Sequence, residues 1–204
     1  MRTDYSFDLA TRHRVATRHM WQGVDGHVYV GLGYKLPEAQ HAECLPWVTT
    51  AGAPAEEDEV KAAWTKIAHV KFPAGRPPKA RHTGQAKLTR VRLTDAGLQQ
   101  TFEAQFSAAL ADCRRASRFG TAFDSFPGGA SLALLDLTMF GPGISTDLAM
   151  AADMRDWKQC ARILSIPGES FRQAELQRLF TLAAEKPPLP DHAIPRYFGA
   201  PEGA

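Results

Sequence analysis

The sequence predicts a mainly α-helical protein of the α+β class, in which a small N-terminal β-hairpin lobe precedes a lobe built as a helical bundle. A short glycine-bounded run near residue 30 alternates small and large side chains, as strands do. From residue 94 onward, apolar residues recur instead at helical spacings of three and four. With 204 residues and 44% apolar residues, the chain is long enough to bury a core of its own.

The hairpin lobe begins after a weakly helical stretch over residues 7–20, in which Phe7, Val15 and Met20 are the apolar anchors. Gly23 to Gly26 forms a turn, because Asp-Gly suits positions of positive φ between two strands. His27 to Gly33 then alternates as a strand, and its glycines allow close backbone approach. These residues predict one small hairpin.

Two helices and a basic loop follow. Pro37 can occupy the first turn of a helix through Cys44, and Pro54 precedes four acids that suit the positive end of a second helix. The second helix has one apolar face, made by Val60, Ala63, Trp64 and Ile67. Residues 71–93 hold seven Lys or Arg and no acid, and we expect a loop or linker there.

The helical lobe starts at Thr94, which can cap a long helix ending near Arg114. A nearly all-apolar helix spans 130–139 and belongs at the centre of the core, and Gly141-Pro142-Gly143 stops it. Three further helices are expected to begin at caps, which are Ser145, Asp156 and Ser170. We therefore expect one domain over residues 1–186, with a hairpin lobe at about 20–70 and a helical lobe at about 94–186, and an extended proline-rich tail over 187–204.

Composition excludes several classes of protein. The net charge of +2 is too small to favour a nucleic-acid partner. The N-terminal stretch has no apolar run for a signal peptide or a membrane span, so we expect a protein that is cytoplasmic as made. Cys44, Cys113 and Cys160 are odd in number and widely spaced, and the seven histidines show no zinc-binding pattern. We expect no metal and no cofactor.

Motifs in both halves resemble those of phage-type lysozymes. His19-Met20-Trp21, Gly26 and Val30-Gly31-Leu32-Gly33 resemble the family's His-Met-Tyr, turn glycine and Thr-Val-Gly-x-Gly. In the second half, the matching stretches resemble its "FDxFP", "ALLDMAFN", glycine-turn and "DWxxCA" elements; they are 123–127, 133–137, 141–143 and 156–161. Residues 36–47 resemble a segment of lysozyme-like effectors of bacterial secretion systems. The resemblance covers roughly residues 7–182 and implies a lysozyme-like fold with a glycan-binding cleft.

The residues that cut glycans in that family are replaced here. An inverting glycosidase needs a carboxylic acid to protonate the leaving oxygen and a carboxylate to direct water. The family's acid maps onto Arg14, which cannot donate a proton at neutral pH; its Asp maps onto Gly23 and its water-holding Thr onto Tyr29. A further family His maps onto Tyr34, and a family Asn maps onto Phe140 or is deleted. The resemblance therefore implies the fold without the chemistry, and we expect no catalytic residue at these places.

Recognition is the function that remains, and its partner is open. A secretion- or toxin-system protein is one candidate, slightly favoured because Arg14 supplies a fixed charge for a partner's carboxylate; a peptidoglycan strand is the other. The expected binding residues are Arg14, Trp21, Tyr29, Tyr34, Phe140 and Arg172. The alternative is an active peptidoglycan muramidase that uses a relocated acid, with Asp25 or Asp8 as candidates, although an Asp in a tight turn is commonly structural. Delivery to the periplasm would then need a specialised secretion system.

Overall fold

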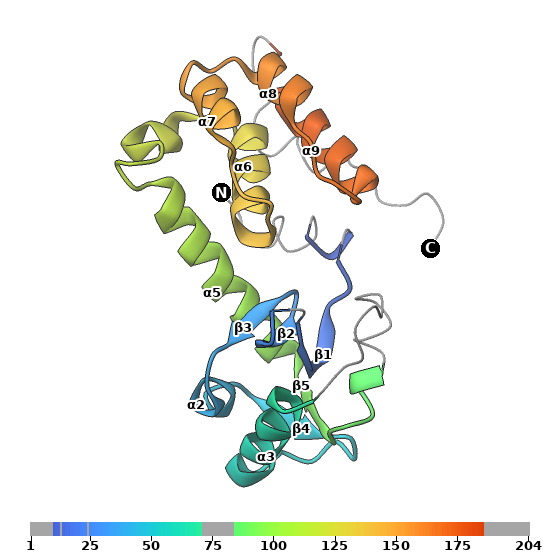
Figure 1. Ribbon diagram of the computed structural model, residues 1–204. Coiled ribbons are helices and arrows are strands. Elements are labelled where there is room, and N and C mark those ends of the chain that lie inside the picture. Colours follow the sequence, from blue (N-terminus) through green and yellow to red (C-terminus); the bar gives the residue numbers. More distant parts are fainter. Residues whose placement is uncertain (1–9, 13, 24, 71–83, 186–204) are drawn as a thin grey trace. The chain divides into compact units, whose positions relative to one another are not determined.

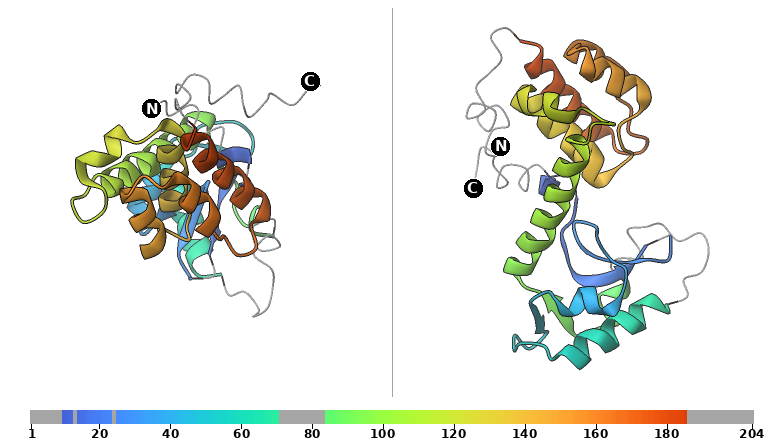
Figure 2. Two further views of the ribbon diagram at one scale, coloured as in Figure 1. Left: turned by 90° about the horizontal axis from the view of Figure 1, so that it is seen from above. Right: turned by 90° about the vertical axis from the view of Figure 1, so that its left-hand side faces the viewer.

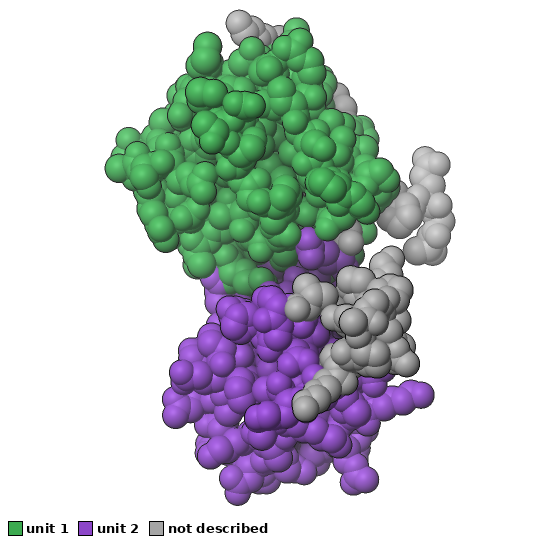
Figure 3. Space-filling view, viewed as in Figure 1, with its two compact units in different colours: residues 1–13, 105–204 green, residues 14–104 purple. Residues whose placement is uncertain are grey.

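The computed structural model describes residues 10–12, 14–23, 25–70 and 84–185. The chain divides into two compact units, drawn in green and purple in Figure 3: unit 1 combines residues 1–13 and 105–204, and unit 2 is residues 14–104. The lobes expected at about 94–186 and 20–70 fall mostly in unit 1 and unit 2, except that residues 94–104 belong to unit 2. The tail expected at 187–204 lies outside the described residues.

Unit 2 contains a three-stranded antiparallel sheet in the order β1-β2-β3, visible in Figure 1. The strands are β1 (Thr17–Gln22), β2 (Val28–Gly31) and β3 (Tyr34–Leu36). Gly31 and Gly33 have φ of +64° and +106°, which only glycine adopts without strain, and they reverse the chain inside the strand expected at 27–33. That prediction was therefore wrong in extent: one strand is two.

The helix expected over residues 7–20 is also wrong in its second half. Ala10 to Arg12 is helical, whereas Thr17 to Met20 belongs to β1, and residues 1–9 and 13 lie outside the described part. Pairing decides this, because the backbone groups of β1 bond to β2 and the Met20 side chain is fully buried on the sheet. Pairing with β2 and burial of Met20 therefore outweigh the weak helical spacing of the apolar residues.

The rest of unit 2 follows the sequence more closely. Helix α2 (Ala39–Glu43) and helix α3 (Glu57–Ala68) lie where prolines and acids predicted them, and Glu56 and Glu59 form a capping box. The prediction missed β4 (Trp47–Thr49) and β5 (Val91–Leu93), which pair antiparallel with Trp47 opposite Leu93. β5 lies within the loop expected at 71–93, and residues 71–83 are outside the described part.

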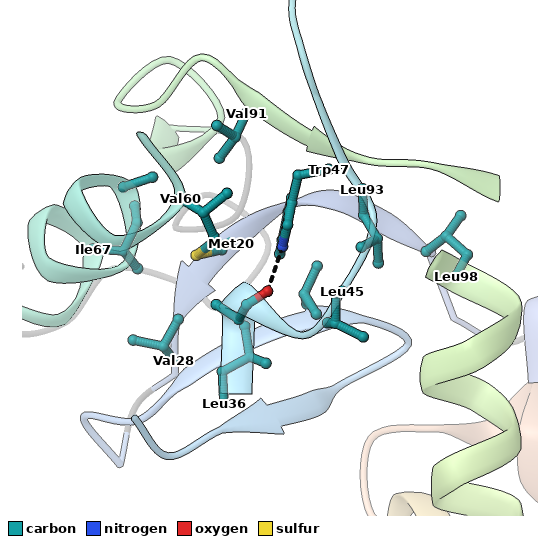
Figure 4. Packing of buried hydrophobic residues seen from close by; sticks show 13 residues of the cluster. Met20, Val28, Leu36, Leu45, Trp47, Val60, Ile67, Val91, Leu93 and Leu98 are labelled. Carbon is teal, nitrogen blue, oxygen red and sulfur yellow. Dashed lines mark hydrogen bonds between the residues drawn. The ribbon is translucent and has the colours of Figure 1, made fainter. Parts of the chain in front are cut away.

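The core of unit 2 lies between its two small sheets and its helices (Figure 4). Trp47 is buried, and its indole N–H donates to the carbonyl oxygen of Ala42 at 2.7 Å, so burial of the ring leaves no polar atom unsatisfied. On α3, the half-buried Trp64 donates in the same way to Leu36 at 3.0 Å. The largest fully buried side chains here are Met20, Leu36, Ile67 and Leu93.

Helix α5 (Asp95–Cys113) begins in unit 2 and ends in unit 1. The predicted cap is confirmed, since the Thr94 hydroxyl accepts the backbone N–H of Gly97 at 3.1 Å. Leu98 and Phe102 are buried in its first half, and Phe106 and Ala109 in its second.

Unit 1 is helical, as Figures 1 and 2 show for the group of helices α6 to α9. A short 3₁₀ turn over Gly120–Ser125 leads into α6 (Gly128–Phe140), whose residues 129–137 are all buried, as expected of a central helix. Helices α7 (Thr146–Asp153) and α8 (Trp157–Ile163) follow. Helix α9 (Ser170–Ala183) packs against both α6 and α8.

Two of the three helix caps predicted in unit 1 are present. The Ser145 hydroxyl accepts from Leu148 N–H and the Asp156 carboxylate from Gln159 N–H, so both are confirmed. Ser170 is instead the first helical residue, preceded by Glu169 as the N-cap.

The mainly α, α+β class is confirmed. Within the part that the structure describes, no helix combines the length and apolar character needed to cross a membrane.

Candidate functional site

The end of the β1–β2 hairpin brings together four of the residues singled out in the sequence. Trp21 and Tyr29 face each other across the two strands, and their rings stack with centroids 4.9 Å apart and planes 25° apart. Both side chains are half-buried. With Gly23 and Asp25 they form what we call the hairpin-end cluster.

Asp25 and Tyr29 are joined by a short hydrogen bond. The Tyr29 hydroxyl donates to Asp25 Oδ2 at 2.5 Å, and the His27 backbone N–H donates to Oδ1 at 3.3 Å. Partial burial acts to raise the pKa of the Asp25 carboxyl, but these bonds and the nearby His27 ring hold it below its ordinary value. Burial and the bond to Asp25 raise the pKa of Tyr29 to about 12. At neutral pH the pair is therefore a carboxylate and a neutral phenol.

Gly23 has no room for a side chain while Tyr29 holds its present position. A Cβ built on Gly23 would lie 2.6 Å from Cε2 of Tyr29 and 2.7 Å from Oδ1 of Asp25, closer than real Cβ contacts. The Tyr29 ring thus takes the space that a carboxylate side chain at position 23 would need.

Gln22, between Trp21 and Gly23, ties the hairpin end to its surroundings. Its backbone N–H donates to Oε1 of the fully buried Gln85 at 2.7 Å, and Gln85 Nε2 donates back to the Gln22 carbonyl at 3.3 Å. The Gln22 side chain donates to the carbonyl oxygens of Ala68 at 2.8 Å and Gly26 at 3.3 Å. Sequence reasoning missed Gln22 and Gln85, because a neutral amide carries no spacing signal.

The other predicted binding residues do not gather at one place in either unit. Arg14 is half-buried ahead of β1, and Tyr34 on β3 packs against the core of unit 2. Phe140 is the last residue of α6 in unit 1 and is half-buried. A role of Arg14, Tyr34 and Phe140 in binding a partner stays a prediction.

Arg172 belongs to the interior of unit 1. Only 2% of its side chain is exposed, and its guanidinium donates to Asp136 Oδ1 at 2.6 Å, to Glu169 Oε2 at 2.9 Å and to the carbonyl of Gly141 at 2.7 Å. These bonds join α9 to the C-terminal end of α6. Because the guanidinium donates to groups inside unit 1, we do not include Arg172 in the binding surface proposed below.

Glu175, one turn after Arg172 on α9, is a carboxyl that sequence reasoning missed. Its side chain is 15% exposed, and Oε1 lies 4.0 Å from the guanidinium of Arg12. Burial raises the pKa of this carboxyl; Arg12 and Arg178 oppose the rise and Asp136 adds to it. The only signal in the sequence was an acid placed beside Leu176 and Leu179 on the buried side of a helix.

Neither the scan against protein-family models nor the search of curated proteins gives a match to this chain. Across the described ranges, no group of three or more His, Cys, Asp or Glu side chains is placed to hold a metal ion.

Proposed function

We propose that this chain is a catalytically degenerate lysozyme-like protein that acts by recognition, with the hairpin-end cluster as part of its binding surface. The proposed partner is a protein of a secretion or toxin system, and delivery to the periplasm by such a system is part of the proposal. The motifs that resemble phage-type lysozymes support the first part, and the contents of the hairpin-end cluster support the second.

The observation that carries the proposal is that the Tyr29 ring fills the space beside Gly23. A water-directing carboxylate at that position requires the Tyr29 ring to move, since even a Cβ would lie 2.6 Å from it. The nearby carboxylate, Asp25, is kept ionised by its hydrogen bonds and so is a poor proton donor at neutral pH. At the position of the family's acid stands Arg14, whose guanidinium stays charged.

The direct test is incubation of the purified protein with peptidoglycan. We expect no new reducing ends and no muropeptides, with a muramidase of known activity as the positive control. Release of muropeptides would overturn the proposal. A triple variant, Arg14→Glu with Gly23→Asp and Tyr29→Thr, asks in the same assay whether restoring the family's residue types restores cleavage.

Binding assays separate the two candidate partners. Co-sedimentation with insoluble sacculi would favour the glycan strand. Its failure, together with a complex from native cell extract that wild-type protein forms and a Trp21→Ala, Tyr29→Ala variant does not, would favour the protein partner. The Val15→Ala change, at an exposed side chain, serves as the matched surface control.

An active muramidase with a relocated acid is the second candidate. Burial raises the pKa of the Glu175 carboxyl, whereas hydrogen bonds lower that of Asp25, so Glu175 is the better proton donor of the two. If wild-type protein released muropeptides, loss of that activity in Glu175→Gln but not in Asp25→Asn would identify Glu175 as the acid.

A further inference from the structure

Asp25 is an exposed carboxylate whose direction is fixed. Two hydrogen bonds, from the Tyr29 hydroxyl and the His27 backbone N–H, hold its two oxygens. A carboxylate has about four acceptor sites, so these bonds leave acceptor capacity on Asp25. None of the ion pairs formed by the described residues uses Asp25.

The surroundings of Asp25 leave it accessible from one side. Gly26 and His27 beside it are exposed, and a Cβ built on Gly26 would have no atom within 4 Å. On the other side lies the Tyr29 ring, which is stacked on Trp21. An ionised acceptor and a half-exposed aromatic pair therefore lie next to each other at one end of a hairpin.

The chemistry that suits this arrangement is a guanidinium group. It is planar, always charged, donates in a fork that matches a carboxylate, and rests on aromatic faces. An ammonium group would satisfy the charge but would use the aromatic face less well, because it is compact and strongly hydrated. A neutral hydroxyl or amide can also donate to the carboxylate, but it lacks the charge that strengthens the bond from a guanidinium.

We propose that Asp25, Tyr29 and Trp21 bind an arginine side chain of the protein partner, its guanidinium paired with the Asp25 carboxylate and its flat face against the aromatic pair. This inference rests on the proposed function, because it names the chemistry of the partner at the same surface. It also gives Asp25 a role in recognition that its place in a tight turn does not require.

The probe for the test is N-acetyl-arginine N-methylamide, titrated into the full-length protein and followed through the indole N–H signals in ¹H–¹⁵N spectra. We expect the Trp21 signal, assigned with Trp21→Phe, to shift with a Kd on the order of millimolar, as suits a single side chain. The indoles of Trp47 and Trp64, bonded inside unit 2, and of Trp157, buried in unit 1, should not move.

Matched ligands and variants make the test specific. The citrulline analogue has nearly the same shape without the charge and should not bind, and the lysine analogue should bind more weakly. Asp25→Asn should lose binding, whereas Asp58→Asn, which removes another exposed acid, on α3, should keep it. Tyr29→Phe keeps the ring but removes the hydroxyl that orients Asp25, so binding should weaken.

Equal binding of the citrulline analogue, or unchanged affinity in Asp25→Asn, would overturn the arginine site. Either result leaves non-hydrolytic recognition standing. Conversely, release of muropeptides in the peptidoglycan assay would overturn the proposed function without changing this titration, so the two failures are distinguishable.

Discussion

The residues at positions 23 and 29 are coupled through space, because the Tyr29 ring lies over the backbone of Gly23. Trp21 pairs with Tyr29 across the strands, which makes residue 23 a diagonal neighbour of that ring. The bond from Tyr29 to Asp25 then holds the ring in place. A side chain introduced at position 23 alone therefore collides with the Tyr29 ring.

This coupling predicts non-additive stability changes. Gly23→Asp alone should destabilise the protein by about 1–3 kcal/mol, the usual cost of overpacking, because the new side chain collides with Tyr29. In a Tyr29→Thr background the same change should cost less, with a coupling of about 1 kcal/mol or more. Urea unfolding of the four proteins measures it, and strictly additive values would contradict the shared space.

Glu175 predicts a pH dependence of opposite sign to that of an ordinary paired acid. Its pKa is raised in the native state, so the folded chain binds the proton more tightly than the unfolded chain does. This contribution is fully present below the unfolded pKa and is lost as pH rises through the raised native pKa. In Glu175→Gln that decline should disappear, because the neutral amide does not titrate.

Stability curves from pH 3 upward, measured by urea unfolding, check this expectation. Glu38→Gln, at an exposed position, is the matched control and should keep the wild-type pH dependence. A Glu175→Gln curve parallel to that of the wild type would show that burial does not set the behaviour of this carboxyl.

At the scale of elements, sequence patterns predicted the helices better than the strands. Capping residues and apolar spacing located α3, α5 and α6, because helical signals are local. β4 and β5 are three residues each and pair across more than forty residues of chain, so no local pattern marks them. The hairpin-end cluster was predicted in part. Trp21, Asp25 and Tyr29 were named, but their contacts depend on the register between β1 and β2, which local sequence patterns do not reveal.

The approach of α6 to α9 predicts a strong effect at one glycine. A Cβ on Gly129 would lie 2.8 Å from the backbone carbonyl oxygen of Leu179, which cannot turn away as a flexible side chain can. Gly129→Ala should therefore destabilise the protein by about 1–3 kcal/mol, although alanine favours helix by about 1 kcal/mol.

Gly84→Ala is the matched control, since a Cβ there would have no atom within 4 Å. It should leave the midpoint of urea unfolding unchanged or slightly raise it. A Gly129→Ala protein as stable as the wild type would mean that the two helices separate at little cost.

At the scale of the whole molecule, helix α5 belongs to both units, since the boundary between them falls after residue 104. Leu98 and Phe102 belong to unit 2, and Phe106 and Ala109 belong to unit 1. A continuous helix is cooperative, because each backbone bond depends on the turn before it. Its continuity should therefore link the unfolding of one unit to that of the other, whatever their relative placement.

A break in α5 at the boundary between the units tests that link. Ala104 is exposed and is the last residue of unit 2, so Ala104→Pro removes a helical hydrogen bond without disturbing a core side chain. We expect wild-type thermal unfolding to give coincident transitions by tryptophan fluorescence and by far-ultraviolet circular dichroism. The first signal reports mainly on unit 2, which holds Trp21, Trp47 and Trp64, and the second mainly on the helices of unit 1. In Ala104→Pro the two transitions should separate, whereas Ala104→Gly, which keeps the backbone N–H, should lower both together by the smaller cost of glycine in a helix. If the two transitions of the proline variant still coincided, breaking the helix would not have uncoupled the units. Contacts other than α5 would then couple their unfolding.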